Sequence, residues 1–139
     1  DLRAVDVEYM LYRESGLLGV SGISSDMRIL QASEDPRARE AIELFVYRLV
    51  KELGALTSAL GGLDALIFSA GIGEHMASVR AAVCERLAWL GIECDAVANA
   101  RHDTLISTSR SLVRVFIIAT DEEAMIAAHT AQALMAFPE

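Results

Sequence analysis

Residues 63–75, LDALIFSAGIGEH, constrain the fold more than any other part of the sequence. The apolar run at 65–69 predicts a buried strand, and Gly71 and Gly73 predict a tight turn into a helix over about 75–90. Glycine lets the backbone approach a phosphate or a purine ring closely, and a helix N-terminus supplies free N–H donors. The segment therefore has the shape of a nucleotide site, although a turn without a ligand is an equally common use of so short a motif.

Further segments alternate between helical and strand patterns. We expect a glycine-punctuated loop at 15–22, helices at 1–13, 25–31, 37–60 and from 121 onward, and strands at 92–95 and 112–119. Asp35 and Pro36 are typical of an N-cap and a first helical position, which sets the start of the long helix. Three strands alternating with these helices indicate an α/β fold with an incomplete sheet flanked by helices. We therefore expect part of a larger sheet or of a longer chain.

Composition limits the classes of partner. The 139 residues, 53% of them hydrophobic, suit one domain over 1–139 with a sizeable core. A net charge of −8 without a basic run argues against nucleic acid or an anionic membrane as a partner. Two cysteines without CxxC spacing favour a reducing compartment, and no apolar run has membrane-spanning length. We therefore expect a cytoplasmic protein.

A second candidate site lies at residues 24–28. A serine N-cap followed by Asp26 in the first turn is enough to explain this segment as a helix start. An aspartate and an arginine two residues apart could also hold a ribose hydroxyl and a phosphate or adenine face, because the guanidinium of Arg28 both stacks and donates hydrogen bonds. The spacing alone leaves both interpretations open.

Residues 120–123 contain a candidate metal ligand. Thr120 and Glu123 have the spacing of a capping box, which accounts for Glu123 structurally. Glu122 is left over, and a spare carboxylate at the end of a strand can reach a Mg²⁺ ion held mainly by phosphates and water. His102 and His129 have no second ligand or nucleophile near them in the sequence, so neither is assigned a site.

A dinucleotide-binding turn is an alternative for the two glycines. Glu93 or Asp95 follows about twenty residues later, where a ribose-binding acid is expected in that fold. The third glycine of the G-x-G-x-x-G pattern would fall at position 76, but Met76 stands there. The helix could not pack as closely as that pattern requires, so the sequence favours this alternative less.

Several segments together resemble the acetate kinase family, with propionate kinase as its close relative. The resemblance rests on five stretches in the same order, which are 21–28 (SGISSDMR), 41–48 (AIELFVYR), 61–74 (GGLDALIFSAGIGE), 106–108 (IST) and 120–123 (TDEE). They extend over nearly the whole chain. This makes the resemblance far more specific than a lone pair of glycines.

The resemblance implies a fold, a reaction and a set of site residues. It implies the superfamily of sugar kinases, actin and chaperone ATPases, in which two ribonuclease H-like lobes enclose a nucleotide, and this chain would be most of the second lobe. The implied reaction is reversible transfer of the ATP γ-phosphoryl group to acetate, with ATP or ADP as substrate and Mg²⁺ as cofactor. The residues implied to bind nucleotide are Asp26, Met27, Arg28, Gly71, Ile72, Gly73, Glu74 and His75. Glu122 is implied to bind Mg²⁺, and the second lobes are implied to pair into a homodimer.

Two departures from the family pattern affect these expectations. The family often has Asn where this chain has His75, which keeps a hydrogen-bonding side chain but adds a titratable group. The family's first lobe, which binds the short-chain carboxylate, and its glycine-rich phosphate loop are not in these residues. We therefore expect a segment that cannot catalyse alone. Propionate kinase, or an isolated non-catalytic module that binds nucleotide or self-associates, remains an alternative.

Overall fold

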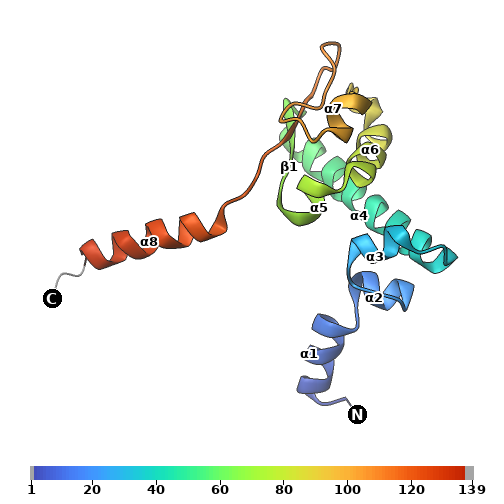
Figure 1. The fold of residues 1–139 in the computed structure, drawn as a ribbon, viewed down its shortest axis with the longest axis vertical. Helices are drawn as coiled ribbons and strands as arrows, with labels where there is room; N and C mark the ends of the chain where they lie inside the picture. The colour runs from blue at the N-terminus through green and yellow to red at the C-terminus, as the bar shows by residue number, and fades with distance from the viewer. Residues whose placement is uncertain (1, 137–139) are drawn as a thin grey trace.

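The computed structural model describes residues 2–136, which form helices around a small parallel sheet (Figure 1). In chain order the elements are α1 (Ala4–Arg13), α2 (Gly16–Ser21), α3 (Met27–Ala32), α4 (Pro36–Leu60), β1 (Ala65–Phe68), α5 (Ala70–His75), α6 (Ala77–Arg86), the 3-10 turn η1 (Ala88–Leu90), α7 (Ala96–Ala100), β2 (Arg114–Ile117) and α8 (Glu122–Ala136). The mixture of helices with a short sheet confirms the α/β prediction in outline.

The sheet consists of two parallel strands, β1 and β2. Ala65 lies opposite Arg114 and Phe68 opposite Ile117, so the two strands end together. The strand predicted at 92–95 is wrong, because this segment contributes only an isolated antiparallel bridge between Cys94 and Ser107. The extended segment ends at Asp95, which is the N-cap of α7. The Asp95 side chain accepts hydrogen bonds from the N–H groups of residues 97 and 98.

The long helix α4 confirms the local signals read from the sequence. The Asp35 carboxylate accepts a 2.9 Å hydrogen bond from the Arg37 N–H, and Pro36 occupies the first helical position. The helix ends at Gly61, whose φ of 75° is the left-handed conformation that glycine adopts without a Cβ penalty. Helix α4 packs against α2, α3 and α6. It thereby supports α3, whose first residues belong to the candidate site.

The hydrophobic core lies between α4, α6 and the two strands. Helix α6 contributes Val79, Val83 and Cys84, each at most 2% exposed. The other buried members of this core are Met27, Val46, Leu66, Met76, Leu87, Ile92, Ile106, Val113, Val115 and Ile117. Full burial of such side chains contributes roughly 1.5–3 kcal/mol each, so this core fixes α6 against the sheet.

Two segments are more helical than the sequence predicts. The loop expected at 15–22 is the helix α2, because Leu17 packs against the core and Gly22, with φ 64°, closes the helix by donating to the Leu18 carbonyl. The helix expected over 75–90 begins at Ala70 instead, breaks at Met76 and ends at residue 86. The paired glycines suggested a non-helical turn because glycine is a poor helix former, but tertiary contacts described below hold them in α5.

The first and last helices project from the core (Figure 1). Helix α1 has no buried residue, and all of its large apolar side chains except Val7 are exposed. Residues 122–135 of α8 are also exposed, including Met125, Ile126 and Leu134. No helix within residues 2–136 has the combination of length and apolar content needed to cross a membrane.

Candidate functional site

The two segments predicted to bind nucleotide line one pocket. This pocket has a volume of about 450 Å³, within the range of about 300–1,000 Å³ typical of small-molecule sites. Its lining residues are Ser25, Asp26, Met27, Arg28, Gly71, Ile72, His75 and Met76. Six of the eight predicted residues are therefore brought together, from the start of α3 and from α5. Gly73 and Glu74 are not among the lining residues.

Asp26 and Arg28 form one wall of this pocket as a linked pair. The Asp26 carboxylate accepts from the Arg28 N–H at 2.8 Å and from Arg28 Nη2 at 2.6 Å. The Arg28 hydrogen bonds lower the pKa of Asp26 to about 2, so it is ionised at neutral pH. Asp26, and not the predicted serine, is the N-cap of α3. The Arg28 side chain is 80% exposed, which leaves its guanidinium face open to a ligand.

The two glycines of α5 differ in what surrounds them. A Cβ built on Gly71 would have no atom within 4 Å, and Gly71 lines the pocket. A Cβ on Gly73 would lie 3.2 Å from the Phe68 carbonyl carbon, so this glycine allows α5 to approach β1 closely. Between the strand and the glycines, Ala70 has φ 57°, an unfavourable conformation for a residue with a Cβ. Of the two glycines, Gly71 is therefore the one with open space beside it, in the pocket.

The Glu74 side chain reaches away from the pocket to the segment before α8. Its Oε1 accepts hydrogen bonds from the Thr120 N–H at 3.1 Å and from the Thr120 hydroxyl at 3.4 Å. The Thr120 N–H is the main cause that lowers the pKa of Glu74. The contact joins α5 to the chain just before α8. It gives Glu74 a structural partner that the sequence did not indicate.

The start of α8 differs from the predicted one. Asp121 Oδ1 accepts a 2.9 Å hydrogen bond from the Ala124 N–H and thereby caps the helix. The predicted capping box of Thr120 and Glu123 is wrong, because α8 begins at Glu122 and the Asp121 side chain caps it. Glu122 lies exposed in the first turn of α8.

A magnesium site has to be judged from the donors near Glu122. No cluster of three or more His, Cys, Asp or Glu side chains suited to a metal ion occurs within residues 2–136. Mg²⁺ commonly takes one or two carboxylates, with phosphates and water completing its octahedron. One exposed carboxylate fits such an ion when a nucleotide is bound, but it would not hold the ion alone.

Arg80 is the residue near the site that the sequence reasoning missed. Its side chain is 0% exposed, and it donates to the backbone carbonyls of Gly73 and Glu74 at 2.9 Å each. Burial lowers the pKa of Arg80. The available signal was its position one helical turn after Met76 and one turn before Cys84, which places it on the buried face of α6. An arginine in a polar-looking helix is ordinarily read as a surface residue.

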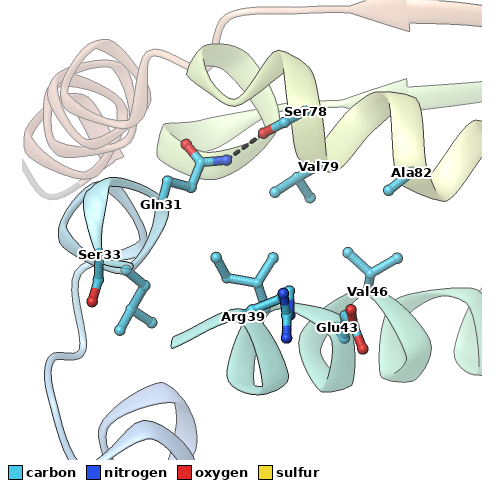
Figure 2. Close-up of a pocket in the computed structure, with 10 residues that line it drawn as sticks. Gln31, Ser33, Arg39, Glu43, Val46, Ser78, Val79 and Ala82 are labelled. Atoms are coloured by element: carbon cyan, nitrogen blue, oxygen red, sulfur yellow. Dashed lines mark hydrogen bonds between the residues drawn. The ribbon is translucent and has the colours of Figure 1, made fainter. Parts of the chain in front are cut away.

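A separate cavity of about 580 Å³ lies beside α3, between the start of α4 and α6 (Figure 2). The Gln31 amide donates a hydrogen bond to the Ser78 hydroxyl across it, which ties α3 to α6. Leu30, Gln31, Ser33, Arg39, Ile42, Glu43, Val46, Ser78, Val79 and Ala82 line it. None of these is a predicted site residue, so the candidate site remains the pocket between Asp26 and His75.

Solved structures of carboxylate kinases contain this fold. The chain superposes on Porphyromonas gingivalis acetate kinase with a TM-score of 0.86 and 37% identity, over 96% of this chain and 35% of that one. It superposes on a propionate kinase from Francisella tularensis with a TM-score of 0.82 and 37% identity, over 91% and 33% of the two chains. The fold is therefore that of a segment of an acetate or propionate kinase.

Sequence comparison gives the family. The sequence model of the Acetokinase family matches residues 1–128, and this chain belongs to that family. Acetate kinase of Rhodopseudomonas palustris strain TIE-1 is 59% identical over 130 residues, which are 92% of this chain and 33% of that protein. Acetate kinase of Rickettsia felis is 54% identical over 122 residues, or 88% and 32%. The chain spans about a third of the length of these curated relatives.

Proposed function

We propose that this chain is the nucleotide-binding part of an acetate kinase, which transfers the ATP γ-phosphoryl group reversibly to acetate. The observation that carries the proposal is the single pocket shared by residues 26–28 and by Gly71, Ile72 and His75. These segments are far apart in the sequence, and they are the ones that the family resemblance implies for nucleotide. Membership of the Acetokinase family supports the reaction.

The pocket residues suit an adenine nucleotide. Met27, Ile72 and Met76 give it apolar surface for a flat base, while the exposed guanidinium of Arg28 offers a stacking face and N–H donors. Gly71 lets the ligand approach the α5 backbone without meeting a side chain. We propose that His75 lies against the nucleoside and supplies the hydrogen-bonding side chain that Asn supplies in many relatives.

Glu122 is proposed to hold Mg²⁺ together with the nucleotide phosphates. When bound, the ion would neutralise charge on the phosphates, and positioning and charge neutralisation are what phosphoryl transfer requires most. Glu122 suits this role because its carboxylate is exposed and the adjacent Asp121 already caps α8. The short-chain carboxylate would bind to residues outside this chain.

The remaining family features are also proposed for the whole protein. They are a ribonuclease H-like lobe in a two-lobed, actin-like kinase, a homodimer formed through the second lobes, and a cytoplasmic location without nucleic-acid or membrane partners. The projecting apolar helices α1 and α8 are compatible with further protein contacts. On its own, this chain is expected to bind nucleotide at most and not to catalyse.

A propionate kinase is the second candidate function. The Francisella tularensis propionate kinase is as similar in sequence, at 37% identity, as the Porphyromonas gingivalis acetate kinase. The two curated relatives described above are acetate kinases and are considerably more similar, which favours acetate.

The proposed function is tested on the full-length protein. Calorimetry should detect ADP binding, and a coupled assay should show a higher kcat/KM with acetate than with propionate. Preference for propionate would replace the first candidate by the second. Absence of both ADP binding and acyl-phosphate formation would refute the proposal, and binding without turnover would favour a non-catalytic module.

A further inference from the structure

Arg80 is a fully buried cation, and no carboxylate is among the hydrogen-bonding partners of its guanidinium group in the described residues. Nε donates to Asn99 Oδ1 at 2.7 Å, Nη2 to the Asn99 carbonyl at 2.9 Å, and Nη1 to the carbonyls of Gly73 and Glu74 at 2.9 Å each. A buried charge without a carboxylate partner is costly unless its hydrogen bonds are satisfied. The guanidinium fork spans two backbone segments at once, which a single ammonium group cannot do.

The carbonyls that Arg80 binds are at the C-terminal end of α5. The last carbonyls of a helix lack intrahelical donors and carry partial negative charge, so a cation there is favourable. The Ile72 carbonyl accepts from the Met76 N–H, whereas the carbonyls of Gly73 and Glu74 accept from Arg80. Arg80 therefore fixes the end of a helix that has only six residues and contains two glycines.

His102 supports the same end of α5 from a second direction. Its Nδ1 lies 2.9 Å from the Glu74 carbonyl oxygen and 3.2 Å from Arg80 Nη2, so it donates to the carbonyl in one tautomer and accepts from Arg80 in the other. The imidazole of His102 thus contacts both the Glu74 carbonyl and the guanidinium group that binds it. His102 has φ 57°, an uncommon conformation for a residue with a side chain, and this conformation accompanies the contact.

These contacts are made to the helix that carries one wall of the pocket. Gly71, Ile72 and His75 line the pocket from α5, while Arg80, which does not line it, binds the carbonyls of Gly73 and Glu74 in the same helix. Helices this short have little intrinsic stability. The orientation of the pocket wall therefore depends on the contacts made by its last carbonyls.

We propose that Arg80 is a positioning residue for nucleotide binding, which holds α5 so that Gly71, Ile72 and His75 face the ligand. This inference rests on the proposed nucleotide site. Arg80 itself does not line the pocket, so its contribution passes through the carbonyls of Gly73 and Glu74.

The test compares Arg80→Lys with wild type in the full-length enzyme. Calorimetry with ADP should show about a tenfold weaker affinity, and the KM for ATP should rise by a similar factor. The KM for acetate should stay within about twofold, because acetate is proposed to bind to residues outside this chain. Without nucleotide, hydrogen exchange of the amides in residues 70–76 should become faster. An unchanged ADP affinity in Arg80→Lys, when wild type binds ADP, would overturn this inference alone. Failure of wild type to bind ADP would overturn the proposed function, and this inference with it.

Val83→Ala serves as the matched control for loss of stability. Val83 is also fully buried on α6, and its core position is one turn beyond Arg80. Its truncation should lower the melting temperature but leave the ADP affinity and the exchange of residues 70–76 near wild type. An equal loss of ADP affinity in Val83→Ala would show a general effect of instability and would overturn the proposal.

A second variant decides the matter if Arg80→Lys does not fold. His102 is exposed, so His102→Ala removes the imidazole that contacts the Glu74 carbonyl and Arg80, with little effect on the core. It should weaken ADP binding about threefold and speed exchange in residues 70–76. Wild-type ADP affinity in this variant would contradict the idea that the fixed end of α5 controls the pocket.

Discussion

The two glycines of α5 should respond in opposite ways to the same added methyl group. In Gly71→Ala the new Cβ meets no protein atom within 4 Å and enters the pocket. Alanine is favoured over glycine in a helix by about 0.5–1 kcal/mol, so stability should stay level or rise. The methyl group occupies the surface where the ligand is proposed to approach the backbone. We expect ADP affinity to fall at least tenfold, about 1.4 kcal/mol.

In Gly73→Ala the added Cβ would lie 3.2 Å from the Phe68 carbonyl carbon. Helix α5 would have to move from β1 by a few tenths of an ångström, and such overpacking costs about 1–3 kcal/mol. The helical preference of alanine offsets part of this cost, which leaves a net loss of about 0–2 kcal/mol. Any loss of ADP affinity should follow from this displacement and be smaller than in Gly71→Ala.

Both variants are made in the full-length protein and measured by urea denaturation and by calorimetry with ADP. Gly71→Ala should change mainly the ADP affinity, because Gly71 faces the pocket. Gly73→Ala should change mainly the unfolding free energy, because Gly73 faces β1. A stable Gly71→Ala protein with wild-type ADP affinity would refute the assignment of this pocket to nucleotide. A destabilised Gly71→Ala protein would show that the space beside Gly71 is filled by another part of the enzyme.

Three further predictions concern the carboxylates and the backbone around the site. Glu122→Ala should lower turnover of the full-length enzyme by orders of magnitude and Glu123→Ala should not, with melting temperatures level in both because Asp121 caps α8; normal Mg²⁺ dependence in Glu122→Ala would exclude it as the metal ligand. Ala70→Gly should raise the unfolding free energy by about 0.5–1 kcal/mol in urea denaturation. The φ of 57° costs an alanine about 1–2 kcal/mol, and the greater conformational entropy that glycine gives the unfolded chain offsets part of the relief. Hydrogen bonds from Arg37 lower the pKa of Asp35 to about 2, so its contribution to stability is present above pH 4 and is lost as the pH falls toward 2; melting temperatures across this range should fall less in Asp35→Asn than in wild type.

Local signals in the sequence predicted the elements that are determined locally. The start of α4 follows from Asp35 and Pro36, and its end from Gly61, because caps act on neighbouring N–H and C=O groups. The apolar run before Gly71 correctly predicted β1. The segments that line the pocket were also identifiable, although their meeting in space came from the family resemblance and not from their spacing.

The errors occur where distant contacts decide the structure. The Thr120 capping box failed because Asp121 caps α8, while Thr120 donates to Glu74, far away in the sequence. The glycine segment proved helical because Arg80 binds its last carbonyls. In each case a local rule correctly described the preference of the residues but not the partner that overrode it. Arg80 itself is recognisable only from its place on the buried face of α6.

Glu74 connects the two halves of the proposed site, and its role can be separated from direct nucleotide contact. Its carboxylate binds Thr120, two residues before the proposed metal ligand Glu122, while the helix that carries it forms the pocket wall.

Glu74→Ala removes the link between α5 and the start of α8, so the Mg²⁺ concentration for half-maximal activity should rise several-fold. Affinity for metal-free ADP should stay near wild type, because the Glu74 side chain does not line the pocket. Glu74→Gln is the matched control, since its amide oxygen can still accept from the Thr120 N–H and should preserve most of the Mg²⁺ response. If Glu74→Ala instead weakens metal-free ADP binding as much as Gly71→Ala does, the carboxylate contacts the nucleotide directly, as the family resemblance implied, and the link to Thr120 is secondary.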